Sequence, residues 1–81
     1  MPEELATGKK VVGLKQVHKA VMQGRAVKVY VACDAEERLA EPLLEECRQA
    51  EIPTDEGCTM QQLGRACSIA VGTAAVAMLA E

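Results

Sequence analysis

The residues best suited to chemistry lie at the start of one amphipathic segment. Gly13 precedes a stretch with helical periodicity, in which Lys15 and Lys19 lie one turn apart with Gln16 beside them. The first amides of a helix lack partners and carry partial positive charge, so this helix start can hold an anion. Two ammonium groups and an amide side chain suit a phosphate backbone and a base edge together. A solvated lysine face explains the same pattern, and the residues alone favour that simpler interpretation.

Other reactive residue types form no catalytic or metal-binding pattern. His18 is the only histidine, and no cysteine is near it in the sequence. The glycines are isolated and do not form a phosphate-binding loop. No two cysteines have the spacing of a zinc knuckle, the four being Cys33, Cys47, Cys58 and Cys67. The sequence therefore predicts no enzyme, no metal site and no cofactor.

The cysteines and apolar runs favour a cytoplasmic protein with reduced thiols. The first residues, Met-Pro-Glu-Glu, contain no apolar segment typical of secretion. Cys33 and Cys67 lie in apolar runs and are expected to be small core residues. Reduced thiols are therefore expected in place of two disulfides. The final apolar run, Ile69–Ala80, is 12 residues long, too short to cross a bilayer.

The charge of the chain is segregated. The net charge is −3, yet residues 1–28 contain six Lys and Arg against two Glu, a net +4. Residues 29–57 contain nine Asp and Glu against two Arg, a net −7. The net charge is therefore a poor guide to partners. Tyr30 is the only aromatic residue, so no aromatic platform for single-stranded nucleic acid is expected.

Periodicity predicts seven elements in one domain of residues 9–81, after a lead-in at 1–8. Pro42 suits the first turn of a helix, so the helix of the acidic region is expected at 42–51. The last segment is ambiguous, because Val76 favours a strand whereas the alanines alone favour a helix. The expected strands are 10–12, 26–33, 54–57 and 73–80, and the helices are 14–23, 42–51 and one capped by Thr59 that runs to Ala66. This alternation predicts a three-layer sandwich with a sheet between helices.

Four side-chain expectations follow from the same patterns. Lys28 and Tyr30 share one side of their strand by alternation. Gly64 inside a helix indicates close packing. Glu45 and Glu46 are expected on a solvated outer face, and His18 is expected to be structural or solvated.

Two separated segments carry a resemblance to a known family. The string Val12-Gly-Leu-Lys-Gln-Val-His-Lys-Ala-Val-Met-Gln-Gly-Arg-Ala resembles the first signature of the kink-turn RNA-binding ribosomal-protein family (the L7Ae type), and is similar to its small bacterial members. The second signature resembles Leu63-Gly-Arg-Ala-Cys-Ser-Ile-Ala-Val-Gly-Thr-Ala-Ala-Val-Ala. Val31–Glu36 also matches, and the resemblance runs from about Lys9 to Leu79. Two motifs in register are a specific match.

The resemblance implies an α/β/α sandwich around a mixed four-stranded sheet. It also implies binding to a kink-turn, an RNA helix bent by a bulge beside tandem sheared G·A pairs. Gly13 would start the recognition helix, and Lys15 and Gln16 fall where archaeal members have an Asn-Glu pair that reads the guanines. Glu36 matches an acidic position that supports the site. The implied RNA-binding residues are Gly13, Leu14, Lys15, Gln16, Lys19, Glu36, Arg65, Ser68, Ile69, Ala70 and Val71, of which the last four form the loop against the flipped-out nucleotide.

The chain departs from the family pattern at five positions. Lys15 and Gln16 exchange a negative acceptor for a neutral one. Leu14 replaces a small or hydroxylated residue. Ser68 stands where glycine is common, and Ala70 stands where an acidic residue is frequent. The apolar residues of the loop remain, so packing on an extruded base is still expected.

The resulting hypothesis is a monomeric RNA-binding protein that stabilises the kinked form of a kink-turn and is ribosome- or ribonucleoprotein-associated, with no DNA or membrane partner. Lys9, Lys10 and Arg65 would add contacts to phosphates. The acidic segment is expected in the other helical layer, away from the basic helix start. The alternative is a protein-interaction module of the same fold that uses its acidic face and lacks specific RNA affinity; a fold without either activity is a third possibility.

Overall fold

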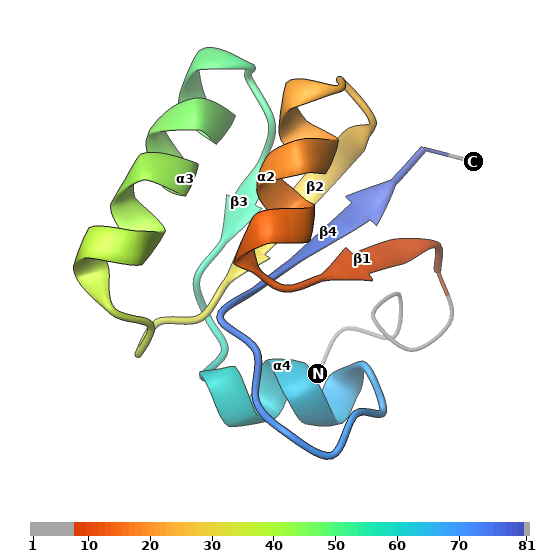
Figure 1. Cartoon of the computed structure of the whole chain (residues 1–81), viewed down its shortest axis with the longest axis vertical. Coiled ribbons are helices and arrows are strands. Elements are labelled where there is room, and N and C mark those ends of the chain that lie inside the picture. The colour runs from red at the N-terminus through yellow and green to blue at the C-terminus, as the bar shows by residue number, and fades with distance from the viewer. Residues whose placement is uncertain (1–7, 81) are drawn as a thin grey trace.

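The computed structural model describes residues 8–80, so only Gly8 of the expected lead-in is among the described residues. Four strands form one mixed sheet in the order β1-β4-β2-β3, with β4 antiparallel to β1 and β2, and β3 parallel to β2 (Figure 1). The expected alternation is confirmed, and the ambiguous last segment is a strand. The elements are β1 (Lys10–Val12), α2 (Leu14–Met22), β2 (Ala26–Val31), α3 (Glu37–Gln49), β3 (Thr54–Asp55), α4 (Met60–Ala66) and β4 (Ala75–Leu79).

The sheet lies between two layers of helices, which confirms the three-layer α/β/α sandwich. Alternate residues of β2 and β4 face opposite layers. Val29 and Ala77 belong to the core beneath α2 and α3, whereas Tyr30 and Val76 belong to the core against α4. The predicted shared side of Lys28 and Tyr30 is confirmed, because the Lys28 ammonium lies 4.8 Å from the centre of the Tyr30 ring.

The acidic segment does not lie in the other layer, and that expectation is wrong. Helices α2 and α3 pack side by side on the same face of the sheet (Figure 1). The strands β1, β2 and β3 are parallel to one another, and the chain crosses the sheet in one direction from each to the next. Because such crossovers are right-handed, both connecting helices fall on the same face.

Helix α3 begins at Glu37, five residues before the expected start at Pro42, and ends at Gln49. A proline at this position costs one backbone bond, to the carbonyl of Arg38, and both residues lie on the exposed side of the helix. Ala40, Leu43 and Cys47 are buried at helical spacing. Packing of this apolar stripe outweighs the lost bond, so the proline did not mark the helix start.

Strand β2 ends at Val31, and Cys33 is exposed, so its placement in the core was wrong, whereas Cys67 is buried as expected. The pairing of β2 with β4 ends before Cys33, whose N–H donates to the Cys58 carbonyl at 2.8 Å. All four cysteines are free thiols. Strand β3 is also shorter than expected, because the Asp55 carboxylate accepts from the Gly57 N–H and turns the chain.

Helix α4 begins and packs as its sequence predicts. The Thr59 hydroxyl accepts from the Gln62 N–H, and the Gln62 side chain accepts from the Thr59 N–H, which forms a capping box. Gly64 packs against the backbone of the following loop, since a Cβ there would collide with the carbonyl oxygen of Val71. This contact fixes the loop against the helix.

Candidate functional site

The sheet register brings three distant segments to one end of the molecule. Val12 pairs with Val76, and Val31 pairs with Ala75, so β1 and β2 end where β4 begins. The turn at Gly13, the start of α3 and the loop before β4 therefore lie at the same end of the sheet, the lower end in Figure 1. These three segments hold most of the candidate residues predicted from the sequence, while Lys19 lies further along α2 and Arg65 lies in α4.

Helix α2 starts without a cap from any side chain. Gly13 has a φ of 102°, a conformation that favours glycine, and its N–H donates to the Ala75 carbonyl at 2.9 Å. This bond ties the turn to β4. No side chain of the described residues 8–80 caps the helix, and its first turn contains no acidic residue. The first amides are therefore open to an external acceptor.

The polar candidates of α2 are exposed and unpaired. Lys15, Gln16 and Lys19 all point to solvent, and none has an ion pair or side-chain hydrogen bond within residues 8–80. Leu14 differs from them, because its half-buried side chain packs on the core. Leu14 therefore anchors the start of α2 on the core.

Glu36 lies at the neighbouring start of α3 and has a cation of its own. Its carboxylate lies 2.6 Å from Nε of Arg38, and both side chains are largely exposed. The sequence did not predict that Arg38 is the partner of Glu36. Leu39, one turn further along α3, lines a hollow of about 410 Å³ together with Leu14 and Lys15, so the two helix starts adjoin.

The loop after α4 presents apolar side chains to solvent. Ser68 adopts a left-handed conformation with a φ of 61°, and its N–H donates to the Arg65 carbonyl. The Ile69 N–H donates to the Gly64 carbonyl, which completes a Schellman motif. Ile69 is 37% exposed and Val71 is 72% exposed. A tightly held loop thus offers two apolar side chains that the core does not use.

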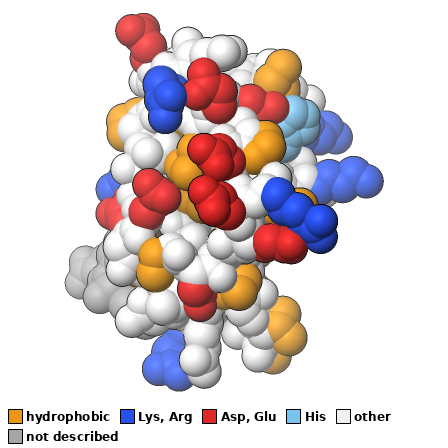
Figure 2. Space-filling model, turned by 90° about the vertical axis from the view of Figure 1, so that its left-hand side faces the viewer, with side chains coloured by type: hydrophobic (Ala, Val, Ile, Leu, Met, Phe, Trp, Pro, Cys, Tyr) orange, Lys and Arg blue, Asp and Glu red, His pale blue; other side chains and the backbone are white. Residues whose placement is uncertain are grey.

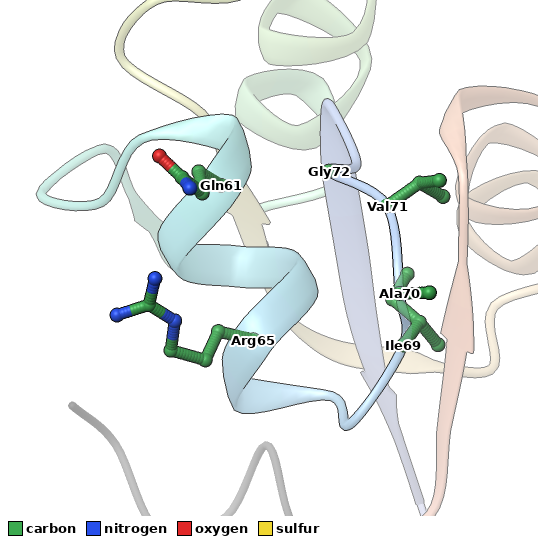
Figure 3. A pocket seen from close by; sticks show the side chains of 6 residues that line it. All are labelled: Gln61, Arg65, Ile69, Ala70, Val71 and Gly72. Carbon is green, nitrogen blue, oxygen red and sulfur yellow. The ribbon is translucent and has the colours of Figure 1, made fainter.

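Arg65 and the loop point in different directions. Figure 3 shows Arg65 and Gln61 projecting from α4 on one side, while Ile69 and Val71 project on the other. These residues, with Ala70, line a hollow of about 150 Å³. Gln61 was not predicted, although its spacing of four residues from Arg65 was a usable signal. Arg65 therefore flanks the apolar pair without joining it.

Lys10 lies close to the loop. Burial raises the pKa of the Cys67 thiol, and the nearby Lys10 ammonium opposes this rise. Cys67 directly precedes the loop, so the charge of Lys10 reaches the α4 side of the sheet. Lys9 is exposed beside it. Lys10 thus adds positive charge near the start of the apolar loop.

His18 bridges the two helices of one layer. Its Nδ1 lies 2.7 Å from Oε1 of Glu46 on α3. The expectation that Glu46 lies on a solvated outer face is wrong, because its side chain is 30% exposed and paired. The His18 side chain is 54% exposed and paired with Glu46, so both alternatives from the sequence, structural and solvated, describe it.

Within residues 8–80, no group of His, Cys, Asp and Glu could hold a metal ion, and no helix is long and apolar enough to span a membrane.

Comparisons with known proteins point to one family. The model of the Ribosomal protein L7Ae/L30e/S12e/Gadd45 family matches residues 1–81. An RNA-binding protein of Geobacillus sp. (strain WCH70) is 41% identical over 75 residues, which cover 93% of this chain and 92% of that protein. An RNA-binding protein of Caldanaerobacter subterraneus subsp. tengcongensis is 44% identical over 69 residues, which cover 85% and 84% of the two chains. These names describe RNA-binding proteins and no enzyme, in agreement with the sequence reading.

Two solved structures share the fold. A Bacillus halodurans protein of unknown function has a TM-score of 0.88 at 26% identity, and the match covers 96% of this chain and 82% of that one. The Giardia lamblia 15.5kD RNA binding protein has a TM-score of 0.83 at 26% identity, covering 89% and 61% of the respective chains.

Proposed function

This chain belongs to the Ribosomal protein L7Ae/L30e/S12e/Gadd45 family, and from that premise we propose that it is an RNA-binding protein that recognises kink-turns. We also propose that the protein is a cytoplasmic monomer associated with the ribosome or another ribonucleoprotein. The proposal also includes the eleven candidate residues as the RNA interface, with Leu14 and Glu36 in supporting positions.

One observation carries the proposal. An uncapped helix start with unpaired Lys15 and Lys19 lies at the same end of the sheet as a loop that exposes Val71. The Gly13 N–H is hydrogen-bonded to the Ala75 carbonyl. Val71 is only four residues before Ala75, so the Cα atoms of Val71 and Ala75 are within about 14 Å of each other. A bent RNA offers closely spaced phosphates and an extruded base at this scale.

The mechanism is a shift in the RNA's own equilibrium. The first amides of α2, with Lys15 and Lys19, would neutralise phosphates of the kinked strand. Gln16, with Lys15, would read base edges. Ile69 and Val71 would cover the base that the bulge extrudes. Since the extended RNA cannot make these contacts together, the protein binds the kinked form better and so raises its population.

The decisive experiment is a calorimetric titration with a kink-turn duplex and with the same duplex lacking the bulge. We expect tight binding to the first only, weakening as salt rises. Replacement of the G·A pairs by Watson–Crick pairs should also abolish tight binding. Equal affinity for the kink-turn and its Watson–Crick version would contradict specific recognition. No affinity for either duplex would favour the protein-interaction alternative.

Two variants separate phosphate binding from base reading. Lys19→Ala should weaken binding to all RNAs and lower the salt slope by about one. Gln16→Ala should reduce discrimination between G·A and Watson–Crick versions by about 1–3 kcal/mol, if the base-edge magnitudes of DNA apply. Gln49→Ala, an exposed glutamine near the far end of α3, is the control and should change neither quantity.

A further inference from the structure

A groove runs between α3 and the edge strand β3, apart from the proposed RNA interface. It consists of two adjoining hollows of about 390 and 330 Å³, and both are lined by Leu44 and Glu56. Half-buried apolar side chains form its floor, including Ala35 and Ile52. Because β3 is a two-residue strand at the edge of the sheet, no further strand of residues 8–80 covers this side. We call this feature the α3–β3 groove.

Carboxylates line the α3–β3 groove without counterions. Glu37, Glu41 and Glu56 are exposed, and within residues 8–80 none has an ion pair or hydrogen bond from its side chain. Glu37 and Glu41 are one helical turn apart, where like charges repel. The one cation among the lining residues, Arg48, lies 2.9 Å from Glu45 and is already paired. The groove therefore keeps an unbalanced negative charge.

Figure 2 shows this arrangement on the face that α3 covers. Carboxylate side chains gather over the centre, with hydrophobic side chains between them, while most Lys and Arg side chains lie toward the margins. This mixture differs from an ordinary solvated helix face, because the apolar side chains lie in a hollow and not singly on a ridge. The negative charge also repels phosphates, so RNA is a poor occupant.

We propose that the α3–β3 groove binds a short basic segment of another protein, in which Arg or Lys alternates with apolar residues. An extended segment directs alternate side chains to opposite sides. Its apolar side chains would pack on Leu44 and Ile52, and its cations would reach Glu37, Glu41 and Glu56. Between Glu37 and Arg48 the helix rises about 16 Å, the length of about five extended residues.

The experiment titrates a fluorescein-labelled peptide, Arg-Leu-Arg-Leu-Arg, into the whole protein and follows fluorescence anisotropy. We expect saturable binding that Glu41→Lys weakens by about tenfold, through loss of an attraction and gain of a repulsion. The matched control is Glu51→Lys, which makes the same change of charge at another exposed and unpaired glutamate outside the groove. This control should alter affinity by less than about twofold.

Two further peptides test both parts of the groove. Glu-Leu-Glu-Leu-Glu should not bind, because it meets the carboxylates with like charge. Arg-Ser-Arg-Ser-Arg should bind several-fold more weakly than the first peptide, because it leaves the apolar floor uncovered. Equal binding of the serine and leucine peptides, or equal weakening by both lysine variants, would show diffuse charge attraction and overturn the proposal.

Cys33 supplies a readout inside the groove. Its thiol is exposed and lines the first hollow, whereas Cys47 and Cys67 are buried. The bound peptide should slow alkylation of Cys33 by iodoacetamide several-fold, as followed by mass spectrometry. Unchanged alkylation at saturating peptide would overturn the proposed location. A dimer in size-exclusion chromatography that Glu41→Lys dissociates would also overturn it, since the occupant would then be a second copy.

The test is independent of the proposed function. Glu41→Lys lies outside the proposed RNA interface, so this variant should retain the kink-turn affinity of the unchanged protein. Thermal unfolding should be similar for Glu41→Lys and Glu51→Lys, because both side chains are exposed.

Discussion

Helix α2 begins directly after a glycine and meets no side-chain acceptor among the described residues 8–80, whereas α4 begins among several. The capping box of Thr59 and Gln62 satisfies amides at both residues, and Asp34 accepts from the Met60 N–H at 2.8 Å. Gly13 offers no such group, and the residue that follows Leu14 is a lysine. One helix start is closed by the protein's own acceptors, and the other is left open.

The capped start of α4 contributes to the stability of the fold, whereas the uncapped start of α2 leaves amides open to a ligand. Capping side chains each stabilise a helix by about 1 kcal/mol, so an uncapped start is less stable than it need be. The protein anchors α2 by other means, through the Gly13–Ala75 bond and the packing of Leu14 and Val17. The amides that a cap would occupy therefore stay open to an external acceptor.

The largest effect is expected at Gly64, where α4 touches the loop. Gly64→Ala places a methyl group against the Val71 carbonyl and the Gly72 Cα, both backbone atoms that cannot move singly. We expect a loss of about 3 kcal/mol in the free energy of unfolding, measured with urea. Gly57→Ala is the control, because its Cβ would meet only the Asp55 side chain, at 3.1 Å. Equal losses in the two variants would mean that the loop does not depend on this contact.

The next effect tests the open helix start directly. Lys15→Glu places an acid in the first turn of α2, which should stabilise the fold by about 0.5 kcal/mol through the helix dipole. The same change should weaken kink-turn binding about a hundredfold, because it replaces an attraction to phosphate or base by a repulsion. Thermal unfolding and calorimetric titration measure the two quantities, which should move in opposite directions.

Gln61→Glu is the matched control, since Gln61 holds the same second position in α4. It should give a similar gain in stability and, because Gln61 borders the hollow of the apolar loop, a loss of RNA affinity of less than about tenfold. A comparable loss of RNA affinity in both variants would remove the distinction between the two helix starts.

Local patterns predicted most elements of this fold, and their failures have physical causes. The period of α2 and the glycines around it fixed that helix, and Thr59 marked the start of α4. The start of α3 was predicted wrongly from Pro42. The preference of proline for the first turn of a helix does not take into account that burial of Ala40 outweighs one backbone hydrogen bond lost on the exposed side. Asp34 lies in a turn, and its carboxylate also accepts from the Met60 N–H at the start of α4, 26 residues away. No local pattern contains such a contact.

The candidate site was harder to foresee than the elements. The residues alone favoured a solvated lysine face, and only the resemblance joined Lys15 to the loop at Ser68–Val71. The physical link is the register of β4 with β1 and β2, which places both segments at one end. The cation beside Glu36 and the partner of His18 came only with the structure, because each depends on how side chains meet in three dimensions.

The smallest effect compares two helix ends with the same strain. Ser68 and Glu51 both adopt the left-handed conformation at the residue after a helix C-cap, with φ of 61° and 58°, and each is part of a Schellman motif. Ser68→Gly and Glu51→Gly should therefore each stabilise the fold by about 0.5–1 kcal/mol, measured by thermal unfolding.

The RNA titration should separate these two variants. Glycine at position 68 gives the free loop more conformations, and RNA binding must then order Ile69 and Val71 at a cost in entropy. We expect Ser68→Gly to weaken kink-turn binding by about two- to threefold, the equivalent of about half a kcal/mol. Glu51→Gly, at the far end of α3, should leave the affinity unchanged. If Ser68→Gly instead lowers the stability, the serine hydroxyl contributes more than its strained backbone costs, and the loop is held by its side chain as well as by its hydrogen bonds.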